Sequence, residues 1–128
     1  MKQPATHRLG DLQLRILQSL WTRREATVAD VHEALGGSDR YAYTTVATML
    51  RKMEARGLVK HHTEGRSFIY QPSVAETDVS TGMMDHLIDS IFEGSLAEAV
   101  NHLLNNREVS RAELRQLEQL ISERKKQL

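Results

Sequence analysis

The chain of 128 residues contains no cysteine, only two prolines and few aromatic residues. Without cysteine it can form no disulfide bond, no thiolate metal site and no thiol redox switch. No apolar run approaches the roughly 18 uninterrupted residues of a membrane-spanning helix, and the N-terminus lacks the apolar core of a signal peptide. We therefore expect a soluble, cytoplasmic protein.

Motifs for catalysis are also missing. The sequence holds no Gly-rich phosphate loop, no nucleophile elbow and no His-Glu-x-x-His motif. His61 and His62 are adjacent, but neighbours on a strand point to opposite faces and cannot chelate one ion together. Asp85, Asp89 and Glu93 recur every four residues, which is typical of the solvated side of a helix. We expect no catalytic residue, metal or cofactor, and so no enzyme.

The net charge of zero hides an uneven distribution. Residues 1–72 carry 11 Lys/Arg and 7 Asp/Glu, a net charge of +4, whereas residues 73–128 carry 6 and 10, a net charge of −4. A basic module gains counterion release beside the DNA polyanion, and an acidic module does not. The charge pattern therefore favours nucleic-acid binding by the front half.

Three helices followed by a β-hairpin are predicted in the front half. Apolar residues recur at helical spacing over residues 10–22. Thr27-Val-Ala-Asp30 has the pattern that begins a helix, and Gly36-Gly37 ends it. A third helix follows, and residues 58–62 and 67–71 are expected to be strands joined by the four-residue link Thr63-Glu-Gly-Arg66. This order predicts a winged helix-turn-helix.

The third predicted helix, from Tyr43 to the helix-ending Gly57, has two unequal faces. An apolar stripe runs from Val46 to Met53, while threonines and basic residues occupy the opposite side. Threonine methyls and hydroxyls, with Arg and Lys, suit base edges and phosphates in a major groove, and the hairpin of a winged helix touches the flanking backbone. The predicted DNA-binding residues are Tyr43, Thr44, Thr45, Thr48, Arg51, Lys52, His62 and Arg66.

Helical periodicity resumes after Pro72, with a stop at Gly94 and caps at Ser95 and Ser110. These 56 residues cannot easily enclose a core. We expect them to pack against a second copy of the chain, although docking onto their own winged helix stays open. The chain is therefore predicted to be mostly α-helical, with a winged-helix DNA-binding domain (1–72) and a helical dimerisation domain (73–128). The predicted dimer interface is Leu87, Ile91, Leu96, Val100, Leu103, Leu114, Leu117 and Ile121.

The runs Thr44–Val59 and His61–Tyr70 resemble the penicillinase repressor family (the BlaI, MecI and CopY repressors). Leu9–Trp21 is similar to the family's first helix, although Gly10 stands where the family has a Ser or Thr cap, and Ser110–Ile121 is similar to its last helix. The resemblance implies a homodimeric repressor that binds a two-fold symmetric operator in double-stranded DNA and blocks transcription of resistance or stress genes.

The resemblance also bears on the inducing signal. Copper-responsive members carry a C-terminal cysteine cluster, which this chain lacks. Members that control β-lactam resistance are cleaved at an Asn-Phe bond, and gap-free alignment through Gly94 and Ser110 puts His102-Leu103 there, with Asn101 one residue earlier. The Asn-Phe pair is thus not preserved, while an inactivating protease or sensor remains an implied partner. Two other functions stay open: a winged helix that binds proteins instead of DNA, and a metal-dependent enzyme.

Overall fold

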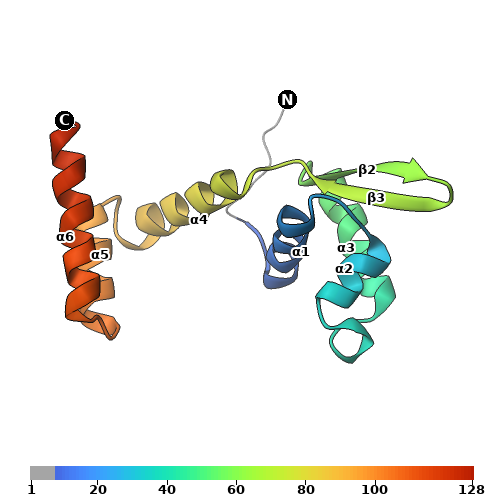
Figure 1. The fold of residues 1–128 in the computed structure, drawn as a ribbon, viewed down its shortest axis with the longest axis horizontal. Helices are drawn as coiled ribbons and strands as arrows, with labels where there is room; N and C mark the ends of the chain where they lie inside the picture. The colour runs from blue at the N-terminus through green and yellow to red at the C-terminus, as the bar shows by residue number, and fades with distance from the viewer. Residues whose placement is uncertain (1–7) are drawn as a thin grey trace. The chain divides into compact units, whose positions relative to one another are not determined.

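The computed structural model describes residues 8–128, which form six α-helices, one short 3₁₀ helix and a small antiparallel sheet (Figure 1). The chain divides into two compact units, which meet between His86 and Leu87. The predicted fold class is confirmed. In chain order the elements are α1 (Asp11–Arg23), β1 (Ala26–Thr27), α2 (Val28–Ala34), η1 (Gly37–Asp39), α3 (Tyr43–Ala55), β2 (Val59–Glu64), β3 (Ser67–Pro72), α4 (Glu76–Ile91), α5 (Leu96–Asn106) and α6 (Arg111–Lys126).

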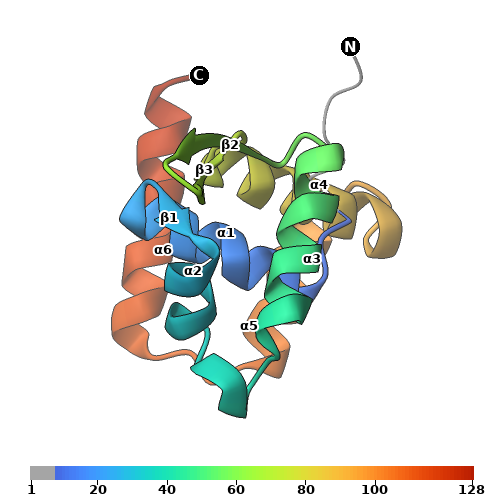
Figure 2. The ribbon, with the colours of Figure 1, turned by 90° about the vertical axis from the view of Figure 1, so that its right-hand side faces the viewer.

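The core of the first unit lies between its three helices and the sheet. The apolar stripes that predict α1 and α3 point inward, because residues three and four apart share one face of a helix. Figure 2, in which the hairpin tip points toward the viewer, shows α1, α2 and α3 gathered on one side of the β2–β3 hairpin. The fully buried side chains of α1, α2 and α3 are Ile16, Leu17, Leu20, Val31, Val46, Leu50 and Met53.

The start of α2 is fixed by the reciprocal cap that the sequence predicts. The backbone N–H of Asp30 donates to Thr27 Oγ1 at 3.1 Å, and the backbone N–H of Thr27 donates to Asp30 Oδ2 at 3.1 Å. The Thr27 backbone N–H, and then its hydroxyl, hold the pKa of Asp30 below its usual value. This cap sets where the chain turns from β1 into α2.

The sheet has three strands in the order β1-β3-β2, all antiparallel. The prediction included only the hairpin, since β1 is two residues long and exists by pairing with β3. The predicted four-residue link was also wrong. The strands continue until Glu64 pairs with Ser67, so the turn is Gly65-Arg66 alone. Gly65 has φ +60°, and glycine with positive φ at the first turn position is typical of a tight type II′ hairpin.

The first unit continues past the hairpin into α4. Val79 is buried and Met83 is partly buried against the winged-helix core. The indole N–H of Trp21 donates to the carbonyl oxygen of Val74 at 2.9 Å, which fastens the start of this segment to α1. The compact unit therefore ends at His86, beyond the predicted boundary at residue 72.

The second unit contains the end of α4 and the helices α5 and α6. Gly94 has φ +81° and ends the turn after α4, as predicted. The hydroxyls of Ser95 and Ser110 accept from the backbone N–H of Glu98 and Glu113, each at 3.1 Å, so both predicted caps are present. In residues 8–128 no helix is both long and apolar enough to cross a membrane.

Candidate nucleic-acid interface

The outward face of α3 carries the side chains that the sequence predicts to bind DNA. Thr44, Thr45 and Lys52 are exposed, and Thr48 is half-buried. These four residues line a shallow depression along the helix, together with Met49. Met49 is half-buried, because it packs against the core on one side and borders this depression on the other. The face therefore offers hydroxyls, methyls and one ammonium group along about two helical turns.

Arg51 is held in place on the same helix. Its Nη2 donates to Thr48 Oγ1 at 3.2 Å, across one turn. The two side chains are three residues apart, the spacing at which helix neighbours meet. A guanidinium ordered in this way keeps its remaining donors free for an acceptor on a base edge or a phosphate.

The N-terminal end of α3 is positioned by α2. His32 Nε2 lies 2.8 Å from the carbonyl oxygen of Tyr41, and its ring meets the edge of Tyr43 with centroids 5.7 Å apart. Tyr43, the first residue of α3, is therefore held on one side by the His32 ring, while the rest of its side chain stays exposed. No local pattern in the sequence points to His32, because its partners Tyr41 and Tyr43 are nine and eleven residues further along the chain.

The hairpin turn lies next to this end of α3. Tyr43, Arg66 and Phe68 line one depression with residues 27–29, where β1 passes into α2. Arg66 is exposed at the turn. The fold thus brings two predicted DNA-binding residues, Tyr43 and Arg66, to a common surface.

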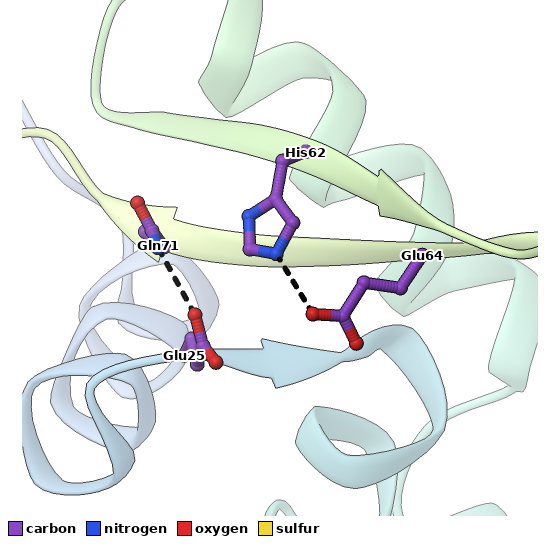
Figure 3. A network of polar contacts seen from close by, with 4 residues as sticks. All are labelled: Glu25, His62, Glu64 and Gln71. Carbon is purple, nitrogen blue, oxygen red and sulfur yellow. Dashed lines mark hydrogen bonds and ion pairs between the residues drawn. The ribbon is translucent and has the colours of Figure 1, made fainter.

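His62 faces away from the helices and has an acidic neighbour. Figure 3 shows His62 and Glu64 side by side on one face of the sheet, with His62 Nε2 3.4 Å from Glu64 Oε1. On the same face, Gln71 donates to Glu25 at 3.0 Å. The carboxylates of Glu64 and Glu25 make this face less attractive to phosphate, so the role predicted for His62 remains a prediction.

His61 points to the opposite face, as alternation along a strand requires. Its Nδ1 lies 2.6 Å from Glu54 Oε1 on α3, and its ring stacks on Phe68. Burial raises the pKa of the adjacent Tyr70 hydroxyl, and the Glu54 carboxylate raises it further, whereas Arg51 acts in the opposite direction. In the described part of the chain, no three His, Asp or Glu side chains are grouped closely enough to hold a metal ion.

The predicted dimer residues lie on the surface of the single chain. Seven of them are between 36% and 65% exposed, which is unusual for large apolar side chains on adjacent helices. Leu117 differs, because it is half-buried in a groove between α5 and α6 that Val100, Leu103 and Leu104 also line. The seven exposed residues are Leu87, Ile91, Leu96, Val100, Leu103, Leu114 and Ile121.

The three-helix core, the hairpin and the exposed polar face of α3 define a winged-helix protein. The family model described as penicillinase repressor matches residues 9–123. The chain therefore belongs to the penicillinase repressor family, which is a family of transcriptional repressors.

Individual relatives agree with this assignment. The penicillinase repressor of Bacillus licheniformis is 26% identical over 117 residues, covering 91% of each chain. The transcriptional regulator BlaI of Mycobacterium tuberculosis is 36% identical over 99 residues, covering 76% of this chain and 72% of its own. The solution structure of the DNA-binding domain of the repressor BlaI superimposes with a TM-score of 0.52 and 28% identity, covering 61% of this chain and 93% of that domain.

Proposed function

We propose that this chain is a homodimeric repressor that binds a two-fold symmetric operator in double-stranded DNA and thereby blocks transcription. The observation that carries the proposal is the exposed face of α3, where Thr44, Thr45, Thr48 and Lys52 lie together beside the hydrogen-bonded Arg51. Such a helix fits a major groove, with hydroxyls and cations directed at base edges and phosphates. The likeness to the DNA-binding domain of BlaI supports the same role.

In this proposal the hairpin acts as a wing that contacts the DNA backbone. Arg66 occupies the exposed turn, where a cation meets phosphate and carries no sequence information. Tyr43 shares a depression with Arg66, so both ends of the contact surface face the same side of the first unit. In such a complex α3 would lie in the major groove, and Arg66 would contact the backbone of the DNA strand beside it.

The second unit provides the proposed dimer interface. The apolar side chains of α5 and α6 are exposed in the single chain, and a second copy would remove them from water. One short helix reads only a few base pairs, so two linked modules are needed to single out a genomic site. A symmetric dimer would place its half-sites about 10 base pairs apart or a multiple of that.

Induction by an inactivating protease or sensor stays part of the proposal. The His102-Leu103 bond lies inside α5, and Asn106 Nδ2 donates to the carbonyl oxygen of His102 at 2.8 Å. A protease needs an extended chain, so cleavage here would require local unfolding of α5. Cleavage would separate α6 from the rest of the chain and thereby weaken the proposed dimer. We expect the repressor to act in the cytoplasm.

Selection of binding sites from fragmented genomic DNA tests this function. We expect the purified full-length chain to enrich a single motif with two inverted halves, and to prefer it over a scrambled duplex of equal length. Titration in increasing salt then separates the sequence-specific contribution from the phosphate contribution. Failure to recover any DNA above background would instead support a winged helix that binds proteins, and recovery of fragments without a common motif would contradict sequence-specific repression.

A further inference from the structure

One polar contact joins the end of α3 to the middle of the hairpin. Glu54 lies in the last turn of α3 and His61 lies in β2, and their side-chain atoms approach to 2.6 Å. The side chain of His61 is only 27% exposed and that of Glu54 35%, so solvent screens their contact less than it screens a fully exposed ion pair. We call these two residues the Glu54–His61 pair.

The pair is continued by aromatic contacts toward the hairpin turn. The His61 ring stacks on Phe68 with centroids 4.1 Å apart and planes 17° from parallel, and it lies 5.5 Å from Tyr70. Both aromatic residues belong to β3. Phe68 in turn lines the depression that contains Tyr43 and Arg66. Contacts therefore lead from the end of α3 through His61 to Phe68, which lines the same depression as the turn residue Arg66.

Because the hairpin is long, a small change in its angle to α3 moves the residues of its turn by a large distance. Glu64, next to the turn, comes five positions after Val59 at the buried base of β2, and at about 3.3 Å per position this distance is roughly 17 Å. A tilt of about 10° at the base would therefore move Arg66 by about 3 Å. Such a displacement is enough to break a hydrogen bond to phosphate.

We propose that Glu54 and His61 are positioning residues for DNA binding, which fix the angle of the wing to α3 and so place Arg66 at the phosphate backbone. The inference rests on the proposed function. Neither side chain needs to touch DNA. Their effect acts through Arg66, and for this reason it can be separated from a simple contribution to stability.

The direction in which the DNA affinity changes distinguishes a positioning role of Glu54 from a general effect of its charge. Glu54→Ala removes both a negative charge and the contact with His61, and a less acidic protein should bind a polyanion more tightly if charge alone decides. We expect the opposite, a roughly tenfold weaker affinity for the selected duplex, with a salt slope lower by about 1, the loss of one phosphate contact. His61→Gln should give the same result.

The hairpin offers a matched control on its other face. His62 and Glu64 form a second histidine–carboxylate contact, at 3.4 Å and largely exposed, that does not reach α3. Glu64→Ala removes an equal charge from the hairpin, where Glu54→Ala removes one from α3, and it leaves the Glu54–His61 pair unchanged. We expect this variant to bind the selected duplex as tightly as the wild type or more tightly.

The experiment is a titration of the full-length chain with the selected and scrambled duplexes at several salt concentrations. Glu54→Asp is included because it keeps the charge but shortens the reach to His61, and thermal unfolding shows that each variant is folded. If the inference is right, Arg66→Ala has little further effect once Glu54 or His61 is changed. Unchanged or tighter binding of these variants, with Arg66→Ala fully effective in each, would overturn it while leaving the proposed function intact. Failure of the wild type to prefer any duplex would overturn both.

Discussion

Replacing Ile121 of α6 with aspartate measures the contribution of the exposed apolar surface to dimerisation. Ile121 is 56% exposed in the single chain, so a charge there costs the folded monomer little. Leu117 is a poorer choice, because it is half-buried against α5 and its loss would disturb the unit itself. Ile121→Asp therefore separates association from folding.

The expected loss of dimerisation free energy follows from the exposed fraction of the Ile121 side chain. Fully burying an isoleucine side chain contributes about 1.5–3 kcal/mol, so covering the exposed 56% of Ile121 would contribute about 1 kcal/mol per chain. A two-fold interface uses the contact twice, which gives about 2 kcal/mol, or about 30-fold in the dimer dissociation constant. Aspartate must also lose hydration at the interface, so 30-fold is a lower bound.

Sedimentation equilibrium over a range of concentrations provides the assay, and thermal unfolding monitors the winged helix. Ser122→Asp is the matched control, because it places the same charge one residue along α6 on its polar side. We expect a weakened dimer for Ile121→Asp, a wild-type dimer for Ser122→Asp, and a folded first unit in both. Equal dissociation constants for the two variants, or a monomeric wild type at micromolar concentration, would refute the reasoning.

Three further predictions concern the first unit. Arg66→Ala should weaken binding to all duplexes by a similar factor and lower the salt slope by about 1 in titrations, whereas loss confined to the selected duplex would count against a phosphate contact. Thr27→Ala should lower the free energy of unfolding in urea by about 0.5–2 kcal/mol, because it removes the hydroxyl that caps α2. The pKa of Asp30 is lowered on folding, so its stabilising effect is present above its unfolded pKa and is lost as the pH falls through the lower folded value. Urea unfolding of Asp30→Asn should therefore depend less on acidic pH than that of the wild type.

Signals that depend on a few neighbouring residues predicted the fold well. The cap at Thr27, the helix-ending Gly57 and the cap at Ser110 depend on local backbone geometry, and the structure contains all three. The apolar stripes of α1 and α3 were equally informative, because a periodic pattern defines the buried face without knowledge of what covers it.

Features that depend on distant pairing could not be predicted in this way. The strand β1 is a strand only because Ala26 and Thr27 pair with Tyr70 and Ile69, more than 40 residues along the chain. The tight turn at Gly65-Arg66 was also missed, since strand ends are set by pairing as much as by composition.

The candidate site shows the same division. Periodicity placed Thr44, Thr48 and Arg51 on the exposed face of α3, because the opposite stripe is apolar. It could not predict that Glu54 meets His61 or that His32 supports Tyr43, since these contacts join different elements. The exposed face of α3 was thus predicted from the sequence, whereas the residues that position this face could be found only from the fold.

The affinity ratio between the selected and scrambled duplexes, measured for Thr44→Ala, Thr48→Ala and Arg51→Ala, tests most directly whether α3 reads the operator. Replacing a residue that contacts a base edge should weaken binding to the selected duplex by about 1–3 kcal/mol and leave binding to the scrambled duplex unchanged. We predict such a selective loss for Arg51 and Thr48. If all three variants keep the wild-type ratio, α3 is not the recognition helix.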